Sequence, residues 1–218
     1  MIMKKNSKDA IVDAAISLFN AKGFQGTTMR DIAGKAKVNI ANISYYFENK
    51  SGLLEHCFTD YYERYINEIE KGMDEFELGA HSCLKKVIEN LLKYQCEHMQ
   101  LTRFVLRELS IDSQVVREIM STYLVKERFY FTKILENGML RQEYKRINIH
   151  YFIIQLKGLL SMPFLNSDYL TEVLYIVPNE KYFAEKYLHE IFNWIDCILS
   201  SKSITKTNFV LQRHVLRS

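Results

Sequence analysis

Apolar residues recur at intervals of three and four along the first segment of the chain, between Ser7 and Lys22. This spacing places them on one broad face of an α-helix. Ser7 can cap the start of such a helix, and Gly23 stands where a C-terminal glycine commonly ends one. The pattern therefore predicts a helix whose apolar face holds Ala10, Ile11, Ala14, Ile16, Leu18 and Phe19.

Two shorter helical patterns follow, at Thr28–Ala36 and Ile40–Phe47. Thr27 or Thr28 can cap the first, and Asn39 can cap the second by accepting a bond from a first-turn backbone N–H. The short link between them is typical of a helix-turn-helix. The side chains predicted to face inward are Ile32, Ala33, Ala36, Val38, Ile43 and Phe47. A small helical bundle that never touches DNA would satisfy the same packing.

The rest of the chain also shows helical spacing rather than alternation. We expect helices at about 51–71, 81–100, 102–109, 113–137, 149–162 and 179–202. Pro163 and Pro178 bracket a segment predicted to be a short helix with irregular flanks. The predicted fold class is all-α, with a helix-turn-helix domain at 1–50, a larger helical domain at 51–202 and a mobile tail at 203–218.

Composition agrees with this fold class. Two prolines and eight glycines are few for 218 residues, and 48% of the residues are hydrophobic, enough to fill a core. No apolar run approaches the ~18 residues of a membrane span, and the N-terminus lacks the apolar stretch of a signal peptide. We therefore expect a cytoplasmic protein without a membrane partner. Its scattered cysteines, expected to be reduced and without metal, are Cys57, Cys83, Cys96 and Cys197.

Positive charge is concentrated near the N-terminus. Up to Glu55 there are eight basic and five acidic residues, and eight minus five equals the +3 of the whole chain. Such asymmetry is typical of an end that faces a polyanion. A solvated basic surface would give the same count.

The second short helix offers a face suited to the major groove of DNA. If Ile43 and Phe47 anchor it from within, its other side chains point outward. Asn42 can read adenine through paired hydrogen bonds, Ser44 either base type, and Ile40 or Ala41 a thymine methyl. Tyr45 and Tyr46 are also expected at DNA, with packing at the edge of the core as the alternative.

Other residues are suited to phosphates, which position a protein without specifying sequence. They are Tyr46, Lys50 and Thr28, with Arg30 and Lys37 as further backbone contacts. The full set of predicted DNA contacts is Thr28, Arg30, Lys37, Asn39, Ile40, Ala41, Asn42, Ser44, Tyr45, Tyr46 and Lys50.

The sequence does not favour an enzyme. It has no glycine-rich phosphate loop, no nucleophile elbow, no HExxH and no paired Cys-x-x-Cys, and its six histidines are dispersed. We expect no catalytic residue, no metal site and no cofactor.

The stretch IVDAAISLFNAKGFQGTTMRDIAGKAKVNIANISYYFENKSGLL, from Ile11 to Leu54, resembles the DNA-binding domain of the TetR/AcrR family of regulators. Three positions depart from the commonest family form: Lys37 and Ala41 each replace a glycine, and Ser44 replaces a tyrosine. These changes leave the base preference open. The matching positions are Ala15, Phe19, Gly23, Phe24, Thr28, Ile32, Ala33, Ala36, Val38, Tyr46, Phe47, Lys50, Leu53 and Leu54.

The resemblance implies a homodimer on double-stranded DNA. Family members usually dimerise through their last two long helices, here near Ile149–Met162 and Tyr182–Leu199, and often enclose a ligand pocket. Two-fold symmetry would set two recognition helices about 34–36 Å apart on an inverted repeat. The apolar stripes could instead pack into their own subunit. The predicted interface residues are Phe152, Leu156, Leu159, Phe183, Tyr187, Ile191, Trp194 and Ile195.

The segments 100–131, 152–165 and 172–183 resemble a group of TetR-type regulators of spore-forming bacteria. These proteins bind DNA near the chromosome origin and restrain assembly of the division protein FtsZ. The resemblance implies FtsZ as a partner of a nucleoid-associated protein. A partner surface would need exposed charges, and an intrasubunit salt-bridge network is the alternative. The candidates are Arg103, Arg107, Glu108, Asp112, Arg117 and Glu118.

A repressor gated by a small-molecule effector is the other functional alternative. It needs a concave, mostly apolar pocket with a few polar groups. The same residues would also serve as plain core. The candidate lining is Phe104, Met120, Tyr123, Phe129 and Phe131, with His98 and Gln95 as polar groups.

Overall fold

The computed structural model describes residues 6–109, 111, 114–178 and 182–200. Across these ranges the regular elements are helices, together with one isolated β-bridge between Tyr144 and Ser200. The predicted all-α fold class is therefore confirmed. The helices are α1 (Ser7–Lys22), α2 (Met29–Ala36), α3 (Ile40–Phe47), α4 (Lys50–Met73), α5 (Ala80–Glu97), α6 (Met99–Leu109), α7 (Gln114–Leu140), α8 (Ile149–Leu165), α9 (Ser167–Glu172) and α10 (Phe183–Leu199).

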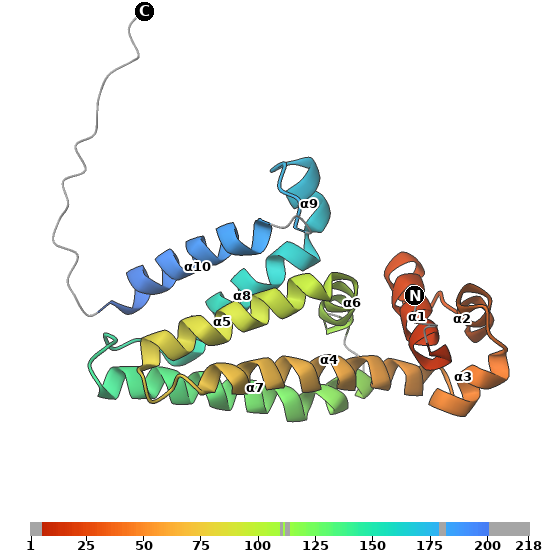
Figure 1. The fold of residues 1–218 in the computed structure, drawn as a ribbon, viewed down its shortest axis with the longest axis horizontal. Helices are drawn as coiled ribbons and strands as arrows, with labels where there is room; N and C mark the ends of the chain where they lie inside the picture. Colours follow the sequence, from red (N-terminus) through yellow and green to blue (C-terminus); the bar gives the residue numbers. More distant parts are fainter. Residues whose placement is uncertain (1–5, 110, 112–113, 179–181, 201–218) are drawn as a thin grey trace, which may run out of the picture.

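The helices form two parts, which we call the head (α1–α3) and the body (α4–α10). Figure 1 shows the head at one end of an elongated molecule, with the long helix α4 running from it through the body. In the body α4 packs lengthwise against α5 and α7, while α6 packs against both α1 and α8. The predicted domain boundary, between residues 50 and 51, falls in the first turn of α4 and stays a prediction. Because α4 also packs on α1 and α3, one helix serves both parts.

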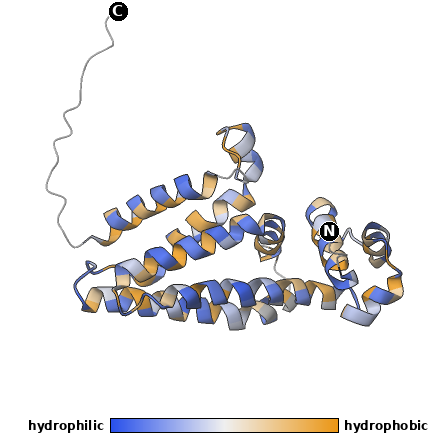
Figure 2. Ribbon diagram, viewed as in Figure 1, coloured by the Kyte–Doolittle hydropathy of each residue, from blue (hydrophilic) through white to orange (hydrophobic). Residues whose placement is uncertain are grey.

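Most of the helices are amphipathic, as the spacing of apolar residues predicts. Figure 2 shows apolar and polar positions alternating around most of them. The apolar sides meet in one continuous core that runs from Ile11 in the head to Leu199 in α10. Its largest fully buried side chains include Phe19, Phe58 and Phe104, which lie where head and body join.

The cap of α1 differs from prediction by one residue, and α4 starts at Lys50, one residue before the predicted start at 51. Asn6, not Ser7, caps α1 by accepting from the backbone N–H of Lys8. Asn49 caps α4 by accepting from the backbone N–H groups of Ser51 and Gly52. Asparagine is among the strongest N-cap residues, so each helix begins just after one.

Helix α8 is longer than predicted, because it continues through Pro163 to Leu165. Proline lacks an N–H, so the carbonyl of Leu159 loses its usual donor within the helix. The hydroxyl of Tyr187 in α10 donates to that carbonyl at 2.8 Å. A contact from another helix thus satisfies the group that the proline leaves unpaired, and it fastens α10 to α8.

The short helix predicted between Pro163 and Pro178 is α9. The last helix begins at Phe183, whereas residues 179–181, where it was predicted to start, lie outside the described ranges, as does the tail at 203–218.

None of the helices in the described ranges combines the length and hydropathy needed to cross a membrane.

Candidate DNA-binding interface

Helix α3 is anchored from one side and open on the other. Ile43 and Phe47 are buried in the core, as the sequence predicts. The six remaining side chains are all exposed, and Tyr45 is the most exposed at 83%. The rings of Tyr45 and Tyr46 meet edge to face, with centroids 5.1 Å apart. The open face consists of Ile40, Ala41, Asn42, Ser44, Tyr45 and Tyr46.

Asn39 fixes where α3 begins. Its side chain accepts from the backbone N–H of Ala41 at 2.9 Å, which is the cap predicted from the sequence. Asn39 is itself exposed, so it stands at the N-terminal end of the open face. The N-terminal residues of a recognition helix are the ones that reach base edges.

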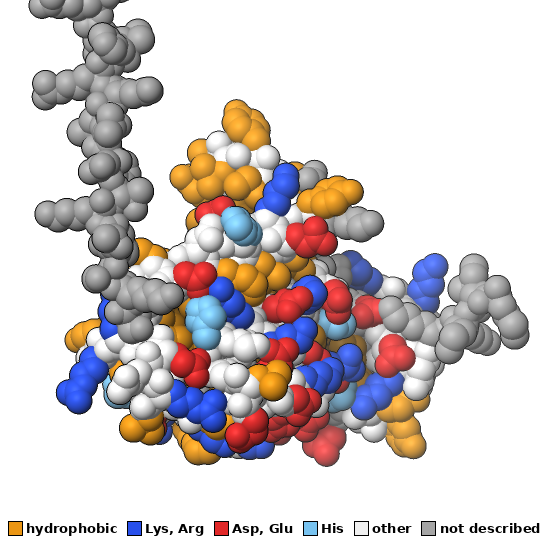
Figure 3. All heavy atoms as spheres, turned by 60° about the vertical axis from the view of Figure 1, so that its left-hand side comes forward, with side chains coloured by type: hydrophobic (Ala, Val, Ile, Leu, Met, Phe, Trp, Pro, Cys, Tyr) orange, Lys and Arg blue, Asp and Glu red, His pale blue; other side chains and the backbone are white. Residues whose placement is uncertain are grey.

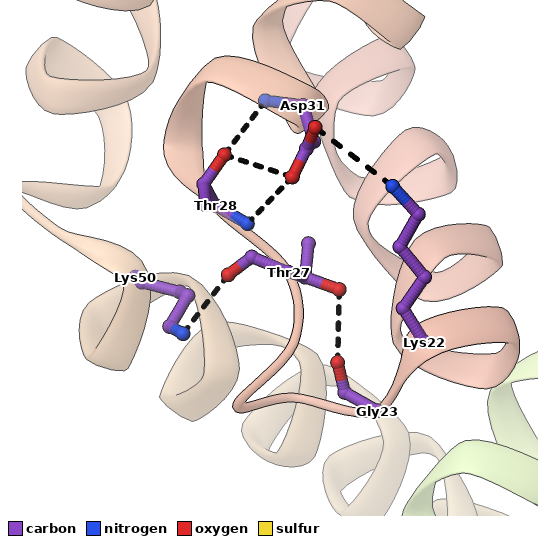
Figure 4. A network of polar contacts seen from close by, with 6 residues as sticks. All are labelled: Lys22, Gly23, Thr27, Thr28, Asp31 and Lys50. Atoms are coloured by element: carbon purple, nitrogen blue, oxygen red, sulfur yellow. Dashed lines mark hydrogen bonds and ion pairs between the residues drawn. The ribbon is translucent and has the colours of Figure 1, made fainter.

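A reciprocal capping box fixes the start of α2, shown in Figure 4. The hydroxyl of Thr28 accepts from the backbone N–H of Asp31 at 3.1 Å and donates to its carboxylate at 2.8 Å. The carboxylate also accepts from the backbone N–H of Thr28, and these two bonds hold the pKa of Asp31 below its ordinary value. The Thr-x-x-Asp spacing signals this motif in the sequence, although the prediction of sites overlooked Asp31.

Lys50 is turned inward rather than toward solvent. Its ammonium donates to the carbonyls of Phe24 and Thr27, each at 2.9 Å, and sits 4.4 Å from the centre of the Phe24 ring. Figure 4 shows it reaching the loop between α1 and α2, where the buried Thr27 bonds to the carbonyl of Gly23. Two of its three N–H donors thus hold the head together. The phosphate contact predicted for Lys50 stays a prediction, whereas its anchoring role is a new finding.

Lys37 ends α2 in a left-handed conformation, with φ of 56° and ψ of 44°. Glycine adopts this conformation without strain, which accounts for the turn glycine of the commonest TetR/AcrR form. The side chains of Lys37 and Arg30 are exposed near α3 and free to face a phosphate backbone. Their predicted contacts with DNA stay predictions.

The charged cluster predicted around the break after α6 does not form one exposed patch. Glu108 is only 8% exposed, and burial raises its pKa. Arg107 donates to the carbonyl of Asn20 in the head, and Arg103 lies 3.7 Å from the carboxylate of Asp168 in α9. Contacts within one chain therefore account for much of this cluster, the alternative that the sequence left open. Arg117 and Glu118 are exposed on α7, and Asp112 lies outside the described residues.

Most of the residues predicted for the dimer interface face the core of their own subunit, so the apolar faces pack within one chain, as the alternative in the sequence analysis allowed. Phe152, Leu156, Phe183, Ile191 and Ile195 are buried within a single chain. The apolar side chains that α8 leaves exposed, such as Tyr151 and Ile154, are not in the predicted set. The sequence predicted one apolar face on this helix, and the rest of the chain covers most of that face. The partly exposed members of the predicted set are Leu159, Tyr187 and Trp194.

The comparisons with known proteins place these features in a family. Residues 11–57 match the model of "Bacterial regulatory proteins, tetR family". The chain is 45% identical over 207 residues to the protein of Bacillus subtilis (strain 168) named "Probable HTH-type transcriptional regulator YttP", covering 94% of this chain and all of that protein.

Solved structures share the fold at lower identity. A regulatory protein of the tetR family from Rhodococcus RHA1 superposes with a TM-score of 0.71 at 19% identity, covering 87% of this chain and 97% of that one. The regulator PfmR from Thermus thermophilus gives 0.67 at 18% identity, with coverage of 85% and 96%. The chain therefore belongs to the TetR family, whose members are DNA-binding transcriptional regulators and not enzymes.

Proposed function

We propose that this protein is a homodimeric regulator that reads an inverted repeat in DNA, with α3 of each copy in the major groove. The observation that carries the proposal is the division of α3 into an anchored side and an open side. The open side carries an amide, a hydroxyl and apolar groups, which are the chemical types that read base edges.

The proposed partner is a second copy bound through the outer side of α8. Its exposed residues follow one stripe at intervals of three and four, and a Cβ on Gly158 would meet nothing within 4 Å. Tyr151 and Ile154 are 66% and 65% exposed, more than an isolated subunit usually leaves uncovered along a whole stripe. Two such helices can pack as half of a four-helix interface. The stripe consists of Tyr151, Ile154, Gly158, Met162 and Leu165.

The apolar surface continues beyond α8 onto α9. Figure 3 shows hydrophobic side chains gathered on the projection at the top of the view, where α9 stands. The exposed residues there include Tyr169, Val173 and Leu174. This continuity supports the same occupant for both helices.

We further propose a role like that of RefZ, also called YttP, the regulator of spore-forming bacteria that the C-terminal segments resemble. In this role the protein acts in the cytoplasm on the nucleoid, binds sites near the chromosome origin and restrains FtsZ assembly at sporulation. The 45% identity to YttP along nearly the whole chain supports it, because the likeness extends through the body as well as the head.

The pocket residues that the ligand-gated alternative predicts do not enclose a ligand-sized cavity around Gln95. Gln95 lies among buried tyrosines, but the cavity that it lines with Tyr61 and Lys157 has a volume of about 10 Å³, room for one water. Drug-sized ligands need about 300–1,000 Å³. Phe129, predicted to line such a pocket, is 59% exposed, and His98 borders a cleft beside α1 instead.

The DNA proposal is tested by selecting binding sites from random duplexes with the full-length protein. We expect an inverted repeat, with affinity that falls steeply as salt rises because phosphate contacts release counterions. Recovery of no preferred sequence, or affinity insensitive to salt, would contradict it.

The division role is tested by mapping bound sites across the genome and by following FtsZ assembly by light scattering. Sites clustered near the origin, together with reduced assembly in the presence of the protein, are expected. A single site beside a transporter or enzyme gene would instead support the ligand-gated alternative.

A further inference from the structure

Apart from α4, which continues the chain from the head and packs on α1 and α3, the head meets the body at α6. Phe104 of α6 stacks on Phe19 of α1 with ring centroids 5.0 Å apart, and Phe58 of α4 meets Phe104 edge to face at 5.9 Å. All three rings are buried. Such apolar contact holds two helices together but has little directional preference, so it does not by itself fix their angle.

Polar contacts beside the rings supply the direction. The side-chain amide of Asn20 donates to the backbone carbonyl of Gln100 at 2.8 Å and to its side-chain oxygen at 3.3 Å. The guanidinium of Arg107 donates to the backbone carbonyl of Asn20 at 3.0 Å. Hydrogen bonds weaken steeply with misalignment, so these contacts resist rotation of α1 about α6.

The carbonyl that Arg107 reaches is a specific kind of acceptor. Helix α1 ends at Lys22, so Asn20 carries one of the last four carbonyls, which have no donor within the helix. A cation is also favoured at the negative end of the helix dipole. Arg107 and Gln100 are seven positions apart on α6, two turns, so both project from the same side.

We propose that Arg107 is a positioning residue, which sets the angle of the head on the body through the carbonyl of Asn20. The inference rests on the proposed dimer on an inverted repeat. In such a dimer the head angle determines the separation of the two recognition helices, which must match about 34–36 Å of duplex. Any rotation of one head is repeated by symmetry in the other.

The first test measures head geometry without DNA. Spin labels are placed on Gln25→Cys, an exposed head position, in a protein with Cys96 and Cys197 replaced by serine. The label-to-label distance distribution of the dimer is expected to be narrow in this background and clearly broader with Arg107→Met. Arg107→Lys, which keeps the charge and a donor, should restore part of the narrow distribution.

The second test measures binding to the selected repeat and to versions whose spacer is one base pair longer or shorter. Arg107→Met should bind the preferred spacing about ten-fold more weakly and discriminate less between spacings. Its binding to an isolated half-site should be unchanged. The matched control is Arg64→Met, because Arg64 pairs with Asp60 within α4, and it should behave as wild type.

Each outcome decides between the claims. A folded Arg107→Met dimer with the wild-type label-to-label distances and the wild-type dependence of affinity on spacer length would overturn the inference. An equal loss of affinity for an isolated half-site would also overturn it, because it would make Arg107 a DNA contact. If that variant does not fold, Arg107→Lys applies the same criteria with a smaller change. Failure of the wild-type protein to bind any repeat would overturn the proposed function itself, whereas the distance measurement would still test the head angle.

Discussion

Individual side chains in the head divide between those that hold it together and those left facing outward. Lys50 and Thr28 were both expected at phosphates, yet Lys50 bonds to two carbonyls and Thr28 closes a capping box. Asn42 and Tyr45 have the outward orientation that their expected roles require. Residue type alone did not separate these groups.

Asn42→Ala should weaken binding to the selected site by about ten- to hundred-fold, because a paired contact to adenine discriminates by about 1–3 kcal/mol. Mobility shifts and size exclusion on the same sample would check affinity and assembly together. Asn90→Ala, a body variant remote from α3, is the control. Unchanged site affinity for Asn42→Ala would remove this residue from the interface.

Lys50→Met and Lys37→Met separate anchoring from phosphate contact. Lys50→Met should lower the free energy of unfolding by about 1.5–3 kcal/mol, because two carbonyls lose a charged donor. Lys37→Met should leave stability nearly unchanged but reduce the slope of log affinity against log salt by about one. Urea denaturation and salt titrations distinguish them. A reduced salt slope with unchanged stability for Lys50→Met would restore its predicted phosphate role.

Asp31 should give a pH-dependent contribution to stability. Its pKa is lowered in the folded protein, mainly by its hydrogen bonds with Thr28, so the contribution is present above the ordinary aspartate pKa of about 3.9 and is lost as pH falls through the lower folded value. Asp31→Asn should therefore be less stable than wild type near neutral pH, with the gap closing in acid. Thermal unfolding of both proteins across that range would check it, and a constant gap would contradict it.

At the scale of elements, single hydrogen bonds and single backbone conformations determine where a helix ends and how two helices are joined. Pro163 does not end α8, because Tyr187 of α10 donates to the carbonyl that the proline leaves without a donor. The link between α2 and α3 closes through Lys37 in the left-handed region, at the position of the usual glycine. Both helices therefore tolerate residues that local preference disfavours.

Tyr187→Phe should destabilise the body by about 1–3 kcal/mol, because a partly buried carbonyl in α8 loses its donor. The control is Tyr130→Phe, which removes a bond to the exposed Glu70 and should cost less. Chemical denaturation of both variants gives the comparison. Equal costs would show that water readily replaces the Tyr187 hydroxyl at Leu159.

At the scale of the whole molecule, the body leaves an apolar stripe exposed on α8, and the head leaves the mixed polar and apolar side of α3 exposed. The stripe on α8 suits a second copy, and the open side of α3 suits DNA. One short head buries too little DNA to bind tightly alone, so the two surfaces are expected to act together.

Ile154→Arg should convert the dimer to a monomer and sharply reduce binding to the full repeat, because a charge would be buried against an apolar partner surface. Light scattering coupled to size exclusion would report the mass. Phe129→Arg, at a similarly exposed apolar position on α7, is the matched control and should remain dimeric. A dimeric Ile154→Arg would place the interface elsewhere.

Sequence periodicity was sufficient for the fold class, for the bounds of α1 and α3 and for the inward side of the recognition helix. Ile43 and Phe47 anchor α3 as expected, because apolar spacing and capping residues act within a few positions of each other. The family motif is also a continuous stretch of the chain, from Ile11 to Leu54, so the sequence alone was enough to indicate the family.

Only the tertiary structure decided what each polar or apolar side chain meets at long range. It showed that Phe152 and Ile195 face their own core and Ile154 does not, that Lys50 points inward, and that Arg107 reaches the head. These partners lie many residues away along the chain. Local spacing therefore determined which residues share a face, whereas packing between distant segments determined which face remained exposed.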